Sequence, residues 1–251
     1  MVFGVLGDLH GAFDAARAIV ARHPEVPFWL CVGDIADEQG RYESLGAPVY
    51  WIHGNNDNFD AIASRDLPGD LHHIDNGTAI ELGGPDGPGS GGAAADASEG
   101  GLAVRPGDAE TAGLGGTFAP TWYDTAAVDL PHPKKGTVKA TELADKRRHF
   151  ARDEVERAAR LRDVDVFLTH EAAKPFRPFP AGKGPDAGKA QINDILRAMQ
   201  PRLHLFGHHH RFSEQRVEGV RSIGLDLVSR SYLLVERPSL TIHLHESTGS
   251  W

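Results

Sequence analysis

Two short apolar runs, VFGVLGD (2–8) and FWLCVGD (28–34), flank the amphipathic stretch AFDAARAIVARH (12–23). Each apolar run has the length of a buried strand, and the stretch between them places apolar residues at helical spacing. A strand, a helix and a second strand in this order form a βαβ unit, which joins neighbouring strands of a layered sheet. The N-terminal part of the chain therefore predicts an α/β fold.

Three later runs have the same form as the first two, namely VYWIHGN (49–55), VDVFLTH (164–170) and LHLFGHHH (203–210). We expect each of them to be a buried strand, and we expect helices to separate the first three strands of the chain. In open α/β sheets, ligands lie where the strands end at their carboxyl edge. All five runs bring Asp, Asn or His to that edge.

The C-terminal part has a different pattern, with the closely spaced runs VRSIGLD (220–226), SYLLVE (231–236) and LTIHLHE (240–246). Such spacing is typical of an antiparallel meander. Two mixed sheets packed face to face, with helices on the outside, accommodate both parts of the chain. We therefore expect a four-layer αββα sandwich with its site at the carboxyl edge of the strands.

The composition favours one soluble domain spanning 1–251, because 251 residues with 40% hydrophobic content are enough for one sizeable core. No apolar run approaches the roughly 20 residues that a membrane span requires, so we expect no membrane partner. The chain begins without the features of an export signal. Its single cysteine, Cys31, lies in an apolar run and predicts a buried thiol. These features favour a cytoplasmic location.

The charge distribution limits the partners. A net charge of −9 argues against a protein that coats nucleic acid, so we expect no large duplex as a partner. Residues 134–189 are nevertheless basic, and they form either a local basic rim or, at 144–161, a solvated amphipathic helix. Residues 83–101 are rich in Gly and Ala and predict a flexible excursion, for which a mobile lid is the alternative.

Polar residues collect at the ends of the five predicted strands. A single Asp there is often a helix cap, a single His is often a core residue, and GNND alone often forms a turn. Their repetition at one edge favours a metal site instead. Oxygen and imidazole donors without thiolates suit divalent Mn, Fe, Co, Ni or Zn, of which we favour Mn, and seven donors are too many for one ion. The motifs are GDLH (7–10), GDIAD (33–37), GNND (54–57), TH (169–170) and GHHH (207–210).

This ordered set of motifs resembles the calcineurin-like metallophosphoesterases, and the resemblance runs through almost the whole chain. It implies the αββα sandwich and a centre of two divalent ions. The implied ligands are Asp8, His10 and His210 for the first ion, Asn55, His170 and His208 for the second, and Asp34 between them.

Two ions at one site predict hydrolysis of a phosphoester by in-line attack of a hydroxide held between them. Relatives hold an acidic imidazole where this chain has Asn56, paired with a carboxylate that is Asp57 here. An amide delivers no proton to a leaving group, so we favour a phosphodiesterase. The alternatives are a phosphomonoesterase, including a protein phosphatase, and a scaffold module without catalysis.

Other residues are candidates for contact with substrate. Arg147, Arg148 and Arg211 are candidates for a phosphate clamp, and Tyr123 for a wall that stacks on a base. Their alternatives are surface charges and a core aromatic. His209 lies between two implied ligands, and either touches substrate or points away from it.

A narrower likeness concerns the substrate. The pieces GLGGTFAPTWYD (113–124), DVFLTHE (165–171) and HLFGHHHRF (204–212) are similar in order to RNA lariat debranching enzymes, which cleave 2′,5′-phosphodiesters. This chain departs from them at His10, where they carry Cys, and at Asn56, where they keep His. The expected substrate is a small phosphodiester, a nucleotide or a short RNA-like molecule. The sequence gives no oligomeric state.

Overall fold

The computed structural model describes residues 1–82, 109–132, 145–178 and 184–247. The predicted excursion at 83–101 lies outside the described residues. Within them, twelve strands form two six-stranded sheets. No helix in these four ranges is long and apolar enough to cross a membrane.

The first sheet has the strand order β12-β11-β1-β2-β3-β4. Its first four strands in sequence pair in parallel, and the two C-terminal strands add an antiparallel ribbon beside β1. The strands are β1 (Val2–Leu6), β2 (Trp29–Cys31), β3 (Val49–Trp51), β4 (Leu71–His73), β11 (Ser231–Glu236) and β12 (Thr241–Glu246).

The second sheet has the order β5-β6-β7-β8-β10-β9. Its four central strands pair in parallel, and the strand at each edge is antiparallel to its neighbour. The strands are β5 (Ala79–Leu82), β6 (Ala109–Leu114), β7 (Val166–Thr169), β8 (Leu203–Phe206), β9 (Ser213–Val217) and β10 (Val220–Gly224). Both sheets are mixed, as predicted.

The two sheets pack face to face through alternating side chains. Leu30 on β2 and Leu168 on β7 are fully buried in one cluster between the sheets. Their neighbours Trp29 and Phe167 point to the opposite faces, because successive strand residues alternate. The buried Cys31 thiol, whose pKa burial raises, lies on the same outer face as Trp29.

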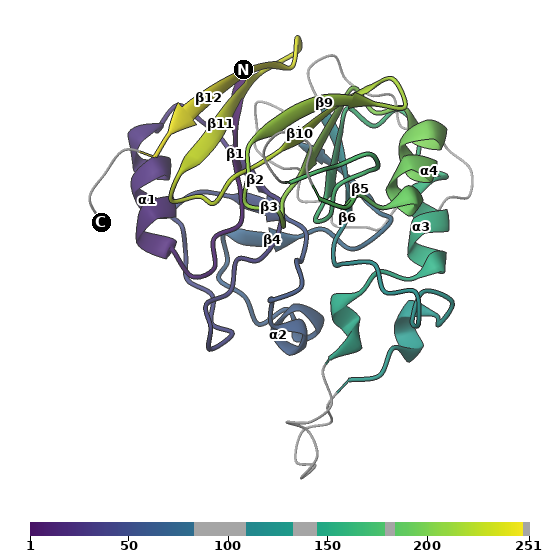
Figure 1. The fold of residues 1–251 in the computed structure, drawn as a ribbon. Coiled ribbons are helices and arrows are strands. Elements are labelled where there is room, and N and C mark those ends of the chain that lie inside the picture. The colour runs from purple at the N-terminus through teal and green to yellow at the C-terminus, as the bar shows by residue number, and fades with distance from the viewer. Residues whose placement is uncertain (83–108, 133–144, 179–183, 248–251) are drawn as a thin grey trace.

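Helices cover both outer faces, which completes the αββα sandwich (Figure 1). Helices α1 (Phe13–Arg22) and α2 (Phe59–Ser64) pack on the first sheet. Helices α3 (Arg152–Ala158) and α4 (Ala190–Met199) pack on the second. The four-layer architecture predicted from the sequence is confirmed.

Three details of the prediction are wrong, and the first is the helix expected between β2 and β3. The described chain runs there as turns and loop. The Asp37 carboxylate accepts hydrogen bonds from the backbone N–H groups of Gln39 and Arg41 at 2.9 Å each. This local bonding competes with the helical pattern.

The second error concerns the amphipathic helix, which is one of the two alternatives for 144–161. The structure has a 3₁₀ turn, η2 (Lys146–Arg148), followed by α3. Between them His149 is extended and forms a bridge with Thr117. Phe150 is buried on the outer face of the second sheet, so a tertiary contact overrides the helical periodicity.

The third error is the C-terminal meander, which the structure divides between the sheets. The run 220–226 forms β10 of the second sheet, whereas 231–236 and 241–246 form β11 and β12 of the first. The connection passes close to the end of β1, where the Val228 N–H donates to the Asp8 carbonyl at 3.1 Å. The chain therefore returns to β1 beside the strand ends that carry the polar motifs.

Candidate metal centre

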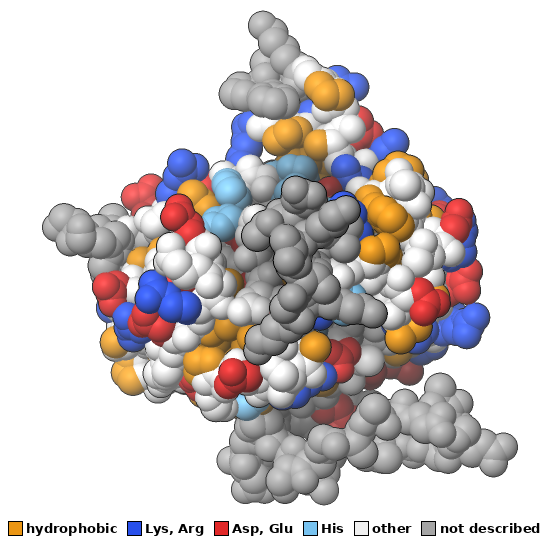
Figure 2. Space-filling view, turned by 90° about the horizontal axis from the view of Figure 1, so that it is seen from below, with side chains coloured by type: hydrophobic (Ala, Val, Ile, Leu, Met, Phe, Trp, Pro, Cys, Tyr) orange, Lys and Arg blue, Asp and Glu red, His pale blue; other side chains and the backbone are white. Residues whose placement is uncertain are grey.

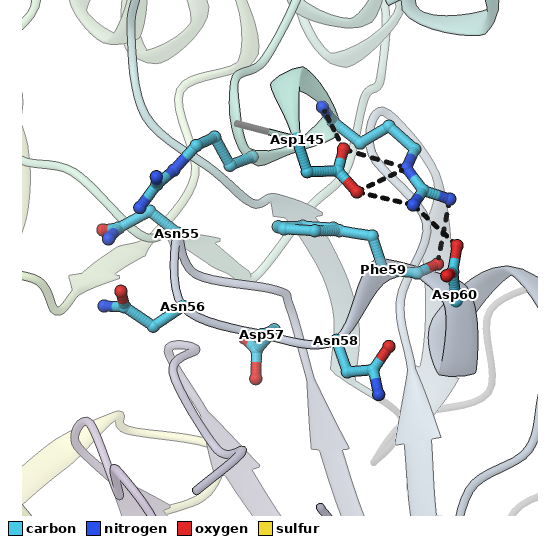
Figure 3. Close-up of a pocket in the computed structure, with 9 residues that line it drawn as sticks. Asn55, Asn56, Asp57, Asn58, Phe59, Asp60 and Asp145 are labelled. Carbon is cyan, nitrogen blue, oxygen red and sulfur yellow. Dashed lines mark hydrogen bonds and ion pairs between the residues drawn. The ribbon is translucent and has the colours of Figure 1, made fainter. Parts of the chain in front are cut away.

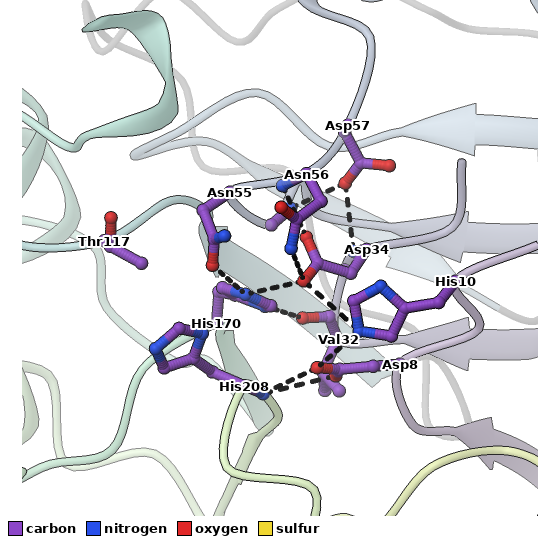
Figure 4. Close-up of polar contacts among 12 residues, drawn as sticks. Asp8, His10, Val32, Asp34, Asn55, Asn56, Asp57, Thr117, His170 and His208 are labelled. Carbon is purple, nitrogen blue, oxygen red and sulfur yellow. Dashed lines mark hydrogen bonds and ion pairs between the residues drawn. The ribbon is translucent and has the colours of Figure 1, made fainter. Parts of the chain in front are cut away.

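The polar motifs converge at one edge of the sandwich, where the parallel strands of both sheets end (Figure 4). Asp8 follows β1, Asp34 follows β2 and Asn55 follows β3 of the first sheet. His170 follows β7 and His208 follows β8 of the second sheet. Figure 2 views the molecule from this side and shows histidine side chains at its surface.

The first group of potential ligands contains Asp8, His10 and His210, whose donor atoms lie within 4.8 Å of one another. The Nε2 atoms of the two imidazoles are 3.0 Å apart. The Asp8 carboxylate is 3.1 Å from His210 Nε2 and 4.0 Å from His10 Nε2. This is the set that the resemblance implied for the first ion.

The second group contains Asp8, Asp34 and His170. Asp34 Oδ2 lies 3.5 Å from His170 Nε2 and 3.6 Å from His10 Nε2, so this carboxylate stands between the two groups. Asn55 Oδ1 is 3.2 Å from His170 Nε2. Asp34 and Asn55 therefore have the neighbours that the resemblance implied for them.

The His170 ring is oriented by the backbone. Its Nδ1 lies 2.8 Å from the Val32 carbonyl, to which only a protonated nitrogen donates. The other ring nitrogen, Nε2, therefore faces Asp34 and Asn55. Such a carbonyl contact fixes the tautomer in which a histidine binds metal.

His208 lies beside His170, with ring centroids 5.0 Å apart, but it is outside both groups. Its backbone N–H donates to Asp8 Oδ2 at 2.9 Å. Its Nε2 is 4.0 Å from the carboxylate of Glu171, a buried residue that the sequence interpretation missed. The only signal for Glu171 is its position directly after His170.

The backbone around the carboxylates is shaped to hold them. A Cβ on Gly54 would lie 2.0 Å from Asp34 Oδ1, and a Cβ on Gly207 would lie 2.2 Å from Asp8 Oδ1. Only glycine leaves this space. Four of the implied ligands also have a left-handed backbone, which is costly for such residues and typical of functional sites. They are His10, Asp34, His208 and His210.

The electrostatics of the centre also fit cations. Asp8 and Asp34 are each 1% exposed, and two buried carboxylates this close together need compensating positive charge. Burial opposes ionisation of Asp34, but the hydrogen bond and charge of His170 lower its pKa. Burial likewise opposes the charge on His170, and Asp34 raises its pKa to about 9. The buried carboxylates, the imidazoles and the glycine cradle together suit divalent metal ions.

Asn56 and Asp57 have different surroundings although they are adjacent. The Asn56 side chain donates to Asp34 Oδ2 at 2.8 Å, so it contacts a potential ligand. The Asp57 carboxylate accepts four hydrogen bonds of 2.7 to 3.1 Å from the backbone N–H groups of Gly54, Asp34, Ile35 and Ala36. These bonds join the turn after β3 to the turn after β2.

His209 lies between a ligand candidate and a core aromatic, because its ring centroid is 5.0 Å from that of His208. Its ring centroid is 4.5 Å from that of Phe176. Its Nε2 is buried without a hydrogen-bond partner among the described residues, and burial lowers its pKa to about 3.

The four candidate substrate-binding residues separate into two pairs. Arg147 and Arg148 line a cavity beside Asn55 (Figure 3). Tyr123 instead packs against Phe118 on the outer side of the second sheet, with ring centroids 5.3 Å apart. Arg211 donates to the Pro178 carbonyl at 2.6 Å. The structure thus brings Arg147 and Arg148, but not Tyr123 or Arg211, to the cavity beside the ligands.

Comparisons with known proteins agree with this geometry. A family model for the calcineurin-like phosphoesterases matches residues 1–212, and the chain belongs to that family. The family consists of hydrolases that act on phosphoesters with divalent metal ions. No curated protein matches the chain.

Solved structures share the fold at low sequence identity. TT1561 of Thermus thermophilus has a TM-score of 0.60 at 11% identity, over 98% of this chain and 99% of that one. GAP50, the anchor in the inner membrane complex of Plasmodium, has a TM-score of 0.54 at 12% identity, over 98% and 84%. At these identities the similarity shows the fold alone.

Proposed function

We propose that the protein is a phosphodiesterase that uses two divalent metal ions, with manganese as the favoured metal, and acts on a small phosphodiester, a nucleotide or a short RNA-like molecule. The diester assignment rests on the hydrogen bond that the Asn56 side chain donates to Asp34. This hydrogen bond places an amide, which has no proton to release near neutrality, beside the carboxylate between the two ligand groups.

The described side chains provide donors for both ions. Asp34 lies between the groups and is the proposed shared ligand. When bound, two such ions neutralise charge on the phosphoryl oxygens and activate a water molecule. The proposed ligands are Asp8, His10 and His210 for one ion and Asn55, His170 and His208 for the other.

The remaining residues hold this arrangement during the reaction. Asn56 fixes the orientation of the Asp34 carboxylate, and Asp57 fixes the turn that presents Asn55. The attacking water gives up one proton to solvent and forms the new bond to phosphorus as the bond to one ester oxygen breaks. That oxygen leaves with the bonding electrons and takes a proton from solvent, because Asn56 has none to give. Diesters with good leaving groups are therefore favoured over alkyl monoesters.

A reconstitution experiment tests this function. Metal-free protein is loaded separately with Mn, Co, Ni, Fe or Zn and assayed on aryl diesters, aryl monoesters, cyclic nucleotides and a 2′,5′-linked dinucleotide. We expect metal-dependent hydrolysis with a higher kcat/KM for diesters than for matched monoesters. A preference for monoesters with every metal would contradict the proposal.

The substitution Asn56→His tests the role of the amide. An imidazole at this position restores a proton donor, so we expect the ratio of monoesterase to diesterase kcat/KM to rise by about tenfold or more. The ratio is measured with aryl and alkyl esters of the same alcohols, alongside metal content. Asn193→His is the matched control, because Asn193 lies on α4, bonds to Lys174 and Glu218 and is not part of the cavity wall. An unchanged ratio with intact metal content would show that position 56 only shapes the turn.

A further inference from the structure

A cavity of about 350 Å³ lies directly beside the proposed ligand Asn55. One side consists of residues 55–60, which form the turn after β3 and the start of α2. The other side consists of Asp145, Arg147 and Arg148 (Figure 3). Cavities of roughly 300 Å³ and above accommodate small-molecule ligands. A phosphodiester at the metal ligands therefore has room here for one of its two substituents.

The Arg147 guanidinium forms ion pairs within the protein. Its Nη2 atom contacts Asp145 at 2.5 Å and Asp60 at 2.7 Å, as the dashed lines in Figure 3 show. Its Nε atom donates to both oxygens of Asp145. These ion pairs fasten η2 to α2, and the single positive charge of Arg147 balances one of the two carboxylates that it contacts.

Arg148 has the same position in the wall but different partners. Its carbonyl accepts the Thr117 N–H at 2.9 Å, which fixes its backbone. Its half-buried guanidinium has no hydrogen-bond or ion-pair partner within the described ranges. The Nδ2 of Asn55 is likewise without a partner there, whereas its Oδ1 is directed to His170. Arg148 and Asn55 therefore place in the cavity wall two donor groups that no described residue engages, and such donors suit an anion.

We propose that this cavity receives one substituent of the diester and that Arg148 selects a substituent carrying its own phosphate group. This inference rests on the proposed phosphodiesterase function. A guanidinium matches the oxygens of a phosphate with two parallel hydrogen bonds. The Phe59 side chain lines the same cavity and provides an apolar surface for the sugar or base of a nucleotide. Arg148 is then a specificity-determining residue.

The kinetic test compares two substrates that differ only in one phosphate, the dinucleotide thymidylyl-thymidine and the same molecule with an additional terminal phosphate. For wild-type protein we expect kcat/KM to be about tenfold higher for the phosphorylated dinucleotide. Arg148→Ala removes this preference, mainly through KM. Arg160→Ala is the control, because Arg160 is exposed after α3 and is not part of the cavity wall. It retains the preference.

A binding measurement gives a readout that needs no turnover. Calorimetric titration of metal-free protein with thymidine monophosphate is expected to show about tenfold weaker binding for Arg148→Ala than for wild type and Arg160→Ala. Thermal melting checks that the variants are folded. Equal binding in all three proteins, or an equal substrate preference in Arg148→Ala and wild type, overturns the proposal. If wild type cleaves neither dinucleotide, the phosphodiesterase function fails, and the binding result alone decides whether Arg148 holds an anion.

Discussion

Asp34→Asn is expected to remove bound metal and hydrolysis together, lowering kcat/KM for a diester by about 1,000-fold or more. Asp34 is 1% exposed and lies within 3.6 Å of His10 Nε2 and 3.5 Å of His170 Nε2. An amide keeps the size of the side chain but loses its charge and one acceptor oxygen. Both ligand groups are affected, because both face this carboxylate.

Metal content and kcat/KM are measured on the same preparation, with circular dichroism to confirm the fold. Asp14→Asn is the matched control, since Asp14 is 88% exposed on α1 and pairs only with Arg17 among the described residues. It is expected to leave metal content and activity unchanged. Full activity with two bound ions in Asp34→Asn would disprove the shared role of Asp34.

Asp57→Ala is expected to lower the free energy of unfolding by about 3 kcal/mol or more. The Asp57 carboxylate is 7% exposed and accepts four backbone N–H groups, three of them from consecutive residues 34–36. Alanine leaves these buried donors without acceptors. The pKa of Asp57 is raised, first by burial and then by the charge of Asp34, so the backbone bonds only partly offset the cost of burying it.

Urea unfolding of metal-free protein measures this effect, because bound metal would add its own stabilisation. Asp14→Ala is the control for loss of an exposed carboxylate, and we expect a change of about 0.5 kcal/mol or less. A wild-type unfolding free energy in Asp57→Ala, accompanied by loss of turnover, would instead assign Asp57 to the chemistry.

The contrast between Asn56 and Asp57 shows what the sequence could and could not predict. Apolar runs with polar ends identified the strands and the edge where Asp8, Asp34 and His170 meet, because local periodicity determines both. The direction of a side chain in a turn depends on partners far away in the chain. Asp57 bonds to residues 34–36, more than twenty positions earlier, and no local pattern encodes that contact.

The same limit explains the other differences. The pattern at 144–161 is helical, but burial of Phe150 and the bridge between His149 and Thr117 interrupt it. Glu171 is buried by its contacts with Phe118 and Lys189, which are distant in sequence. The two arginines of η2 look equivalent in the sequence, and only the ion pairs of Arg147 distinguish it from Arg148. Tertiary contacts, rather than local propensity, determine each of these features.

The most direct test of the metal-dependent phosphodiesterase is a titration of metal-free protein with Mn²⁺, in which bound manganese and diester hydrolysis are measured in the same samples. We expect hydrolysis to be absent without metal and to reach its plateau at two ions per chain. Full hydrolysis without metal, a plateau at one ion, or no hydrolysis with two ions bound would contradict it.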